Sequence, residues 1–299
     1  MRKKVLLTGG SGLLGLGLAE SCPNQWEVSA VRMRKTSYPE YWAKTHVLDI
    51  QNKKCVEEAF SKDSFDVVIH AAGIASVDYV NKNYAESLES NIVGTLNVSS
   101  ACRKRSIPLV YISSNAVFDG QNAPYAEHHK PNPVNEYGEL KLECERLIQK
   151  TLKRYLIVRP ILMYGWNSRS GRANPVTWLL QKLDQGETVK VVDDVRENPL
   201  YNFEAGRSIW VAVEQKLEGI LHLAGGTEVS RYELALATAK IFGKDQNLIE
   251  AVKSSYFPEL AKRPPNTTFS TEKMEKVLGI KPLSLYQGLE AMKNSPRAP

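Results

Sequence analysis

The segment VLLTGGSGLLG, residues 5–15, constrains the fold more than any other part of the chain. It opens with an apolar run typical of a short buried strand, and the apolar stretch at 16–19 suits a helix. Between them, Gly9, Gly12 and Gly15 recur at every third position. A glycine turn between a strand and a helix directs backbone N–H groups and the positive end of the helix dipole at one point. Because side chains are missing there, the turn can admit a phosphate.

The spacing GxxGxxG is a variant of the GxGxxG fingerprint of dinucleotide-binding folds. We expect the cofactor to contact Ser11, Leu13 and Leu14 of this turn as well as its glycines. An ordinary strand-to-helix turn is the alternative. Motifs in the rest of the chain are needed to distinguish these two interpretations.

Strand-like and helical patterns alternate along the sequence. Further strands are expected at 27–31, 45–49, 66–70, 109–113, 155–159 and 220–223, with helices at 53–62, 84–105 and from 136 onward. This alternation predicts an α/β fold with a Rossmann-type, doubly wound parallel sheet.

The pattern changes after residue 164. There we expect helices at 175–185, 204–216, 231–242, 271–278 and 285–292, and a strand at 189–192. We therefore predict an NADP(H)-binding domain over 1–163, to which 200–226 return. A smaller C-terminal α/β substrate lobe would comprise 164–199 and 227–299.

Composition narrows the class of protein. The 299 residues are 42% hydrophobic and 24% charged, without an apolar run of the roughly 20 residues that a membrane span needs. The basic start is followed by too short an apolar run for a signal peptide, so a cytoplasmic protein is expected.

The four cysteines are scattered and His128 and His129 lie in a polar loop, so we expect neither disulfides nor a metal. The net charge of +6 is not organised as a nucleic-acid-binding module, and an anionic small molecule explains it equally well.

The residues after the second strand bear on the cofactor. In a dinucleotide-binding fold this strand ends near the adenosine ribose, where an acidic residue suits a free 2′-hydroxyl and arginine suits a 2′-phosphate. Arg32, Arg34 and Lys35 follow the strand here, and we expect Arg32 to meet the phosphate. The sequence thus favours NADP(H) over NAD(H), with a solvated basic turn as the alternative.

Other predicted cofactor contacts lie mostly at strand ends, because ligands of doubly wound sheets bind at the carboxyl edge. They are Asp49 and Ile50, Ala71, Ala72 and Gly73, Ser113, and Pro160, together with Asn91 in the long helical pattern and Tyr137 and Lys141 in the helix from 136 onward.

Tyr137 and Lys141 are the candidate proton-transfer pair. Four residues apart on a helix, they share one face. An ammonium beside a phenol favours the phenolate and lowers a pKa that starts near 10. Ser114, at the tip of the fifth strand, could hydrogen-bond the reacting oxygen. A chance pair on a surface helix and a turn-capping serine are the alternatives, and Ser113 and Asn115 share that ambiguity.

Taken together, these motifs resemble the extended short-chain dehydrogenase/reductase family, and within it the dTDP-4-dehydrorhamnose reductase branch. The matching pieces span essentially the whole chain. They are TGGSGLLG at 8–15, Val77-Asp78, VFDG at 117–120, PYAE at 124–127, Pro133, YGELK at 137–141, GILHLAG at 219–225 and RPPN at 263–266.

The resemblance implies a reductase that transfers hydride from NADPH to a 4-keto group on a nucleotide-linked deoxysugar. Ser114, Tyr137 and Lys141 match the family's catalytic positions. Contacts with the anionic substrate are expected from Ser114 and Tyr137 and from Val77, Asp78, Asn115 and Arg263. A monomer or homodimer is expected, without nucleic-acid or membrane partners.

The chain also departs from this branch. Ser114-Asn115-Ala116 stands where the reductases commonly have Thr-Asp-Tyr, and Leu162 lies in a segment where the family often has tryptophan. The hydride-transfer residues are therefore kept while the sugar pocket differs. Two alternatives stay open: a regulatory subunit similar to the methionine adenosyltransferase β subunit, and an epimerase or dehydratase with permanently bound NAD.

Overall fold

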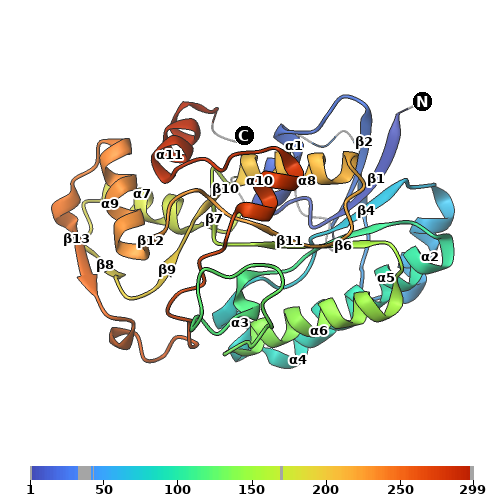
Figure 1. The fold of residues 1–299 in the computed structure, drawn as a ribbon, viewed down its shortest axis with the longest axis horizontal. Helices are drawn as coiled ribbons and strands as arrows, with labels where there is room; N and C mark the ends of the chain where they lie inside the picture. The colour runs from blue at the N-terminus through green and yellow to red at the C-terminus, as the bar shows by residue number, and fades with distance from the viewer. Residues whose placement is uncertain (1, 33–41, 43, 169–170, 297–299) are drawn as a thin grey trace.

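The computed structural model describes residues 2–32, 42, 44–168 and 171–296. Its centre is a seven-stranded sheet in which every neighbouring pair of strands is parallel. The strand order is β11-β6-β5-β4-β1-β2-β3 (Figure 1). The strands are β1 (Lys3–Thr8), β2 (Trp26–Arg32), β3 (Lys44–Val47), β4 (Val67–His70), β5 (Leu109–Ile112), β6 (Tyr155–Pro160) and β11 (Gly219–Leu223). This confirms the predicted Rossmann-type sheet, whose strand order reverses between β1 and β4.

Burial on both faces explains why most of these strands are short apolar runs, whereas the edge strand β3 is largely exposed. Leu6 of β1 packs with residues of α2, α5 and α6, whereas the adjacent Leu7 packs with residues of α1, α8 and α10. The two helical layers lie on opposite sides of the sheet (Figure 1). The bounds are α1 (Leu13–Glu20), α8 (Asn202–Glu214) and α10 (Glu272–Leu278) on one side, and α2 (Lys53–Lys62), α5 (Gly94–Arg105) and α6 (Glu136–Thr151) on the other.

Glycines bring α1 and α8 into close contact. A Cβ atom at Gly17 of α1 would lie 2.0 Å from the carbonyl oxygen of Asn202, and one at Gly206 of α8 would lie 2.3 Å from that of Gly17. Asn202 also donates a hydrogen bond to the Leu13 carbonyl oxygen at 3.1 Å. The helix that follows the glycine turn is thereby fixed against α8.

The helical pattern predicted over 84–105 is interrupted. It consists of α4 (Tyr84–Leu88), a π-helical turn (Glu89–Val93) and α5, and it is preceded by α3 (Val77–Lys82), which sequence patterning did not reveal. The π turn carries Asn91, whose side chain is turned inward toward the loop after β4.

The second group of elements surrounds two further clusters of buried apolar residues. Its helices are α7 (Pro175–Asp184), α9 (Arg231–Phe242) and α11 (Leu285–Asn294). Three small sheets pair β7 (Met163–Tyr164) with β10 (Leu200–Tyr201), β9 (Arg196–Glu197) with β12 (Val229–Ser230), and β8 (Val189–Val192) with β13 (Ile249–Val252). Short 3₁₀ turns span Asn115–Val117, Gln246–Leu248 and Ser254–Tyr256. β11 returns to the main sheet beside β6, while the proposed division into two lobes stays a prediction.

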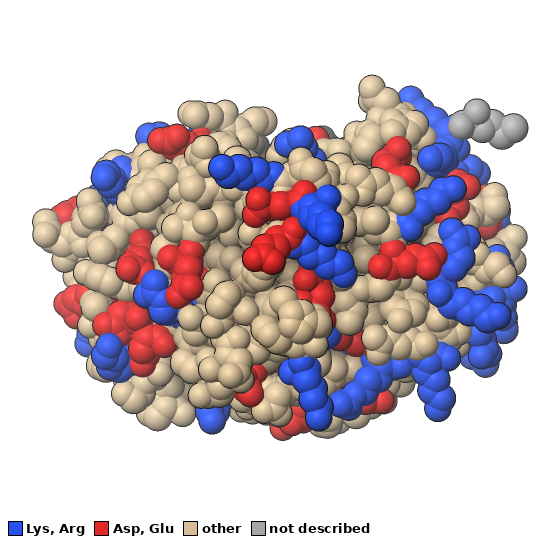
Figure 2. Space-filling model, viewed as in Figure 1, with Lys and Arg blue, Asp and Glu red and all other residues tan. Residues whose placement is uncertain are grey.

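Charge is unevenly distributed over the visible surface. Lys and Arg side chains gather at the end of the molecule where β1, α2 and α5 lie, whereas both signs are mixed at the end formed by α9 and β13 (Figure 2). No helix in the described ranges is long and apolar enough to cross a membrane.

Candidate active site

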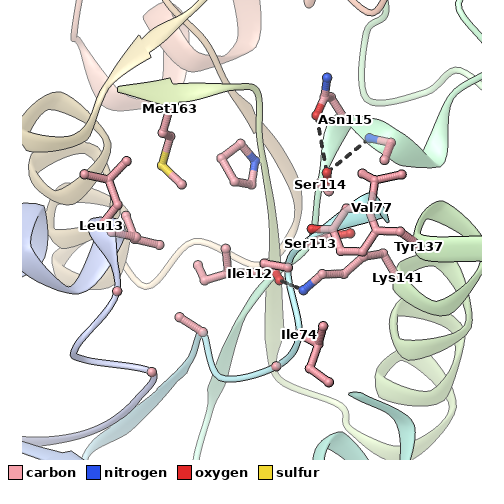
Figure 3. Close-up of a pocket in the computed structure, with 18 of the residues that line it drawn as sticks. Leu13, Ile74, Val77, Ile112, Ser113, Ser114, Asn115, Tyr137, Lys141 and Met163 are labelled. Atoms are coloured by element: carbon pink, nitrogen blue, oxygen red, sulfur yellow. Dashed lines mark hydrogen bonds between the residues drawn. The ribbon is translucent and has the colours of Figure 1, made fainter. Parts of the chain in front are cut away.

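A cavity of about 720 Å³ lies at the carboxyl ends of β1, β4, β5 and β6. Most of the residues predicted from the sequence line it, and Figure 3 shows several of them around the open space. They are Gly9, Ser11, Gly12, Leu13, Leu14, Ile50, Ala71, Ala72, Gly73, Val77, Ser113, Ser114, Asn115, Tyr137, Lys141, Pro160 and Arg263.

The glycine turn has the expected form. Gly9 has a φ of +75°, and a Cβ atom there would lie 2.6 Å from the carbonyl carbon of Ala71. Gly12 precedes the first residue of α1 and donates its N–H to the Gly9 carbonyl at 3.1 Å. Glycine at position 9 therefore lets β1 turn while remaining against the end of β4.

A buried histidine joins these two strand ends. The Nδ1 atom of His70 lies 2.6 Å from the hydroxyl of Thr8, and its Nε2 atom lies 3.1 Å from the hydroxyl of Thr95. Burial, assisted by the charge of Lys141, lowers the pKa of His70 to about 3, so the imidazole is neutral near pH 7. The Thr8 hydroxyl also accepts the Ala72 N–H at 3.1 Å. These bonds fix the floor of the cavity.

Four of the predicted contact residues that the structure describes in full lie outside the cavity lining. Gly15 lies beneath the turn, where a Cβ atom would be 2.2 Å from the Gly10 carbonyl oxygen. Asp49 accepts the N–H of Gln51 at 2.9 Å and caps the loop after β3. Each has a local structural role.

The other two are Asn91 and Asp78. The Asn91 side chain accepts the Ile74 N–H at 2.7 Å and donates to the Ile74 carbonyl at 3.1 Å, so it holds the loop after β4 from behind. Asp78 forms an ion pair of 2.8 Å with Arg263 and accepts the N–H of Ala261. It positions Arg263, which does line the cavity.

The basic residues predicted to select the cofactor cannot be placed. Arg32 is the last residue of β2, but its side chain, like Arg34 and Lys35, lies outside the described part of the chain.

Tyr137 and Lys141 extend from the first turns of α6 toward the cavity (Figure 3). Asn135 begins the helix by accepting the Gly138 N–H at 2.9 Å. A Cβ atom at Gly138 would lie 2.1 Å from the Ala116 carbonyl oxygen, so this glycine lets α6 approach the tip of β5. The side chains of Tyr137 and Lys141 are both more than nine-tenths buried.

The ammonium group of Lys141 is fixed by a strand end. It donates a 2.9 Å hydrogen bond to the carbonyl oxygen of Ile112 in β5 and lies 6.0 Å from the centre of the Tyr137 ring. The phenol and the cation are therefore neighbours in one buried wall, without a direct hydrogen bond between them among the described contacts.

Ser114 is a capping serine that also lines the cavity, and its predicted bond to the reacting oxygen stays a prediction. Its hydroxyl accepts the Ala116 N–H at 3.2 Å, as a capping serine does, and donates to Asn115 Oδ1 at 3.3 Å. It also lines the cavity beside Tyr137 (Figure 3). Ser113 differs, because its hydroxyl donates a short hydrogen bond to the buried carboxylate of Glu145.

That carboxylate belongs to an ion pair beneath the site. Glu145 accepts bonds of 2.9 and 2.6 Å from Arg159 of β6, and both side chains are 2% exposed. Tyr137, Lys141 and Glu145 are spaced by four residues and so follow one face of α6. The ion pair ties this face to β5 and β6.

Apart from Arg263, sequence reasoning missed the wall contributed by the C-terminal half. Glu197 of β9, Arg231 at the start of α9 and Thr267 all line the cavity. Asn115 Nδ2 donates to Glu197 Oε1 at 3.0 Å and to the Thr267 hydroxyl at 2.7 Å, and Glu197 Oε2 lies 2.8 Å from Arg231 Nη2. None of these residues belongs to a recognisable motif, so only their spatial convergence reveals them.

The family follows from comparison with known proteins. The model of the RmlD substrate binding domain matches residues 2–297. The chain belongs to the RmlD substrate-binding domain family. This confirms the predicted resemblance to the reductase branch of the extended short-chain dehydrogenases/reductases.

Relatives of this RmlD-family chain include enzymes and a subunit. It is 26% identical to dTDP-4-dehydrorhamnose reductase of Aggregatibacter actinomycetemcomitans, with 96% of this chain and 97% of that protein covered. It is also 26% identical to methionine adenosyltransferase 2 subunit beta of Danio rerio, covering 93% and 85%. The crystal structure of dTDP-4-dehydrorhamnose reductase from Bacillus anthracis in complex with NADP has a TM-score of 0.87 and 26% identity, covering 98% and 99%.

Within the described ranges, no group of three His, Cys, Asp or Glu side chains is arranged to hold a metal ion. All four cysteines are free thiols, and Cys102 and Cys144 are buried.

Proposed function

We propose that this protein is an NADPH-dependent reductase of a 4-keto group on a nucleotide-linked deoxysugar. The main evidence for this proposal is that one cavity is lined by the glycine turn at one end and by Tyr137, Lys141 and Ser114 at the other. The reductase relatives span nearly the whole chain, which supports the same chemistry.

The residues at the turn fit a dinucleotide. Gly9 and Gly12 leave backbone groups uncovered beside the N-terminus of α1, where a pyrophosphate is favoured by N–H groups and the helix dipole. Small side chains at the end of β4 leave room for a ligand to extend toward β5; these residues are Ala71, Ala72 and Gly73. Leu48 and Ile50 supply apolar contacts on the adenine side of the turn.

When bound, the reduced nicotinamide supplies a hydride for the carbonyl carbon. Tyr137 donates the proton to the carbonyl oxygen, which becomes a hydroxyl. The hydroxyl of Ser114, freed from Asn115 Oδ1, donates a hydrogen bond to the same oxygen and orients it. Lys141, held by the Ile112 carbonyl, places a positive charge near the phenolate that remains. Burial of both side chains excludes water and strengthens that attraction.

The preference for NADPH over NADH is part of the proposal and depends on Arg32. Arginine at the end of the second strand suits a 2′-phosphate. The crystal structure of the Bacillus anthracis relative contains NADP, which supports the presence of a phosphate site in such a fold.

The test is consumption of NADPH, followed at 340 nm, with a panel of nucleotide-linked 4-keto-6-deoxysugars. We expect Tyr137→Phe to lose turnover by about 10²-fold or more, in line with removal of a general acid, while cofactor affinity stays within a few-fold. Tyr155→Phe is the matched control, because it removes a phenol hydroxyl from the first residue of β6, outside the cavity lining. Near-normal turnover by Tyr137→Phe would contradict the proton-donor assignment.

A second candidate is a cofactor-binding subunit without turnover of its own. It is favoured by the similarity to methionine adenosyltransferase 2 subunit beta over 93% of this chain. Tight NADPH binding without oxidation across the sugar panel would support it, particularly if methionine adenosyltransferase co-elutes with the protein in gel filtration.

A further inference from the structure

The cavity wall beyond Asn115 carries a charge pair whose carboxylate is buried and whose guanidinium is partly exposed. The carboxylate of Glu197 is 8% exposed and the Arg231 side chain 26% exposed, and their charged groups approach to 2.8 Å. The remaining Glu197 oxygen accepts the Asn115 amide at 3.0 Å. A carboxylate so buried is retained only with partners, and here it has both a cation and an amide donor.

This pair lies close to the proposed reaction centre. Asn115 directly follows Ser114, and the Ser114 hydroxyl donates to Asn115 Oδ1 at 3.3 Å. Two hydrogen bonds therefore connect Ser114 with Glu197. If a keto oxygen binds between Ser114 and Tyr137, which rests on the proposed function, the sugar ring that carries it lies beside Asn115 and Glu197.

The cations that line the cavity already have acceptors. Lys141 donates to the Ile112 carbonyl, Arg231 faces Glu197, and Arg263 forms an ion pair with Asp78. Among the described residues of the lining, therefore, every Lys and Arg has a partner within the protein. A negatively charged substituent on the sugar ring would meet the Glu197 carboxylate, and the described cation nearest to it, Arg231, is already paired with that carboxylate.

We propose that Glu197, balanced by Arg231, makes the sugar subsite selective for uncharged sugar rings and excludes ring carboxylates such as those of uronic acids. Ring hydroxyls can donate to the carboxylate and accept from the guanidinium. A second carboxylate in the same low-dielectric wall is repelled, because like charges at close range across a binding surface are strongly unfavourable. Glu197 thus acts as a specificity-determining residue.

Binding of dTDP-glucose and dTDP-glucuronate tests this directly, because the two ligands differ only in the group on ring carbon 5. Calorimetric titration with NADP⁺-saturated protein requires no turnover. We expect the wild type to bind dTDP-glucose at least about tenfold more tightly, the ratio that corresponds to about 1.4 kcal/mol. Glu197→Gln keeps an acceptor for Asn115 but releases Arg231, so dTDP-glucuronate should gain about tenfold while dTDP-glucose changes less than about threefold.

Arg231→Gln should act in the opposite direction. It leaves the Glu197 charge uncompensated, so dTDP-glucuronate binding should weaken further relative to dTDP-glucose. Glu233→Gln is the matched control for Glu197→Gln: it also removes one carboxylate charge, from an exposed ion pair with Arg196 outside the cavity lining. A glutamine at this position retains the helix-capping acceptor that now accepts the Ser230 N–H.

The outcomes separate this inference from the proposed function. Absence of binding of either dTDP-sugar to the wild type would overturn the nucleotide-sugar site itself. Binding of both with equal affinity, or an equal change of both on Glu197→Gln, would overturn only the charge selectivity. Thermal melting and NADP⁺ affinity report whether each variant is folded. If Glu197→Gln does not fold, Arg231→Gln still tests the inference, because it should lower the affinity for dTDP-glucuronate relative to that for dTDP-glucose. An unchanged ratio of these two affinities in Arg231→Gln would overturn the inference.

Discussion

Glu204 is a buried carboxyl group whose ionisation should destabilise the protein. It lies in the first turn of α8, is 5% exposed, and accepts the N–H of Leu283 at 2.8 Å through Oε1. Its Oε2 atom is buried without a hydrogen-bond partner among the described residues. Burial raises the pKa of Glu204 to about 7, although the Leu283 bond and the charge of Arg207 oppose the shift. We therefore predict a stability change on replacing Glu204 with Gln.

The sign follows from linkage. A carboxyl pKa that is higher in the folded than in the unfolded state contributes stability that is fully present below the unfolded pKa and is lost as the pH rises through the folded pKa. The free energy of unfolding of the wild type should therefore fall between about pH 4.5 and about pH 7. A shift of that size corresponds to roughly 3 kcal/mol, at 1.36 kcal/mol per pKa unit. Glu204→Gln stays neutral and keeps the acceptor for Leu283, so its stability relative to wild type should rise by up to about 3 kcal/mol between pH 5 and pH 8.

Urea unfolding of both proteins at pH 5, 6, 7 and 8 measures this difference. For a chain of this size the same change corresponds to about 5 °C in Tm. An unpartnered amide in the variant would add a constant penalty of about 1–3 kcal/mol, but it would not create a pH dependence. Glu290→Gln, which removes an exposed carboxylate from α11, is the control and should give a flat difference. A difference between wild type and Glu204→Gln that is also flat would refute the reasoning.

Two further predictions concern the cofactor and the packing of the glycine-turn helix. Arg32→Asp should weaken NADPH more than NADH in fluorescence titrations, because only NADPH carries the 2′-phosphate; equal losses would mean that Arg32 does not meet that phosphate. Gly17→Ala places a Cβ atom 2.0 Å from the Asn202 carbonyl oxygen, so α1 and α8 must separate. We expect a loss of roughly 1–3 kcal/mol in urea unfolding, and an unchanged midpoint would show that the contact relaxes freely.

Most of the sheet was predictable from the sequence because its strands, apart from the exposed edge strand β3, are mainly buried on both faces and are bounded by turns or helices. The small sheets were not, since β7, β9, β10 and β12 have two residues each. Two residues cannot show a periodicity, and their pairing depends on neighbours far away in the chain. The interruption of the 84–105 pattern was likewise invisible, because the π turn (Glu89–Val93) continues the helical path into α5.

The candidate site also has one part that was predictable from the sequence and one part that was not. Strand ends and the pair Tyr137 and Lys141 were predictable, because strand direction and helical spacing determine where such side chains meet. The sequence could not distinguish contact residues from those that support them. Gly15 belongs to the glycine turn and Asn91 to the long helical pattern, yet both lie behind the cavity wall. Glu197 comes from a short strand about 80 residues beyond Ser114 and carries no local signal.

The amide at position 115, where this chain differs from the reductase branch, is coupled to the carboxylate at position 197. The reductase branch that the sequence resembles commonly has aspartate where this chain has Asn115, but here the amide donates to Glu197 at 3.0 Å. An aspartate at 115 would place two carboxylates at that distance in a buried wall, where Arg231 is the one ion-pair partner of Glu197 among the described residues. We therefore expect Asn115→Asp to lower both stability and sugar binding, and Glu197→Gln in the same protein to restore them by reversing the hydrogen bond. A double-mutant cycle on dTDP-glucose affinity and urea unfolding measures this coupling. Additive effects would mean that the two positions vary independently and that the amide at 115 is not a response to the charge at 197.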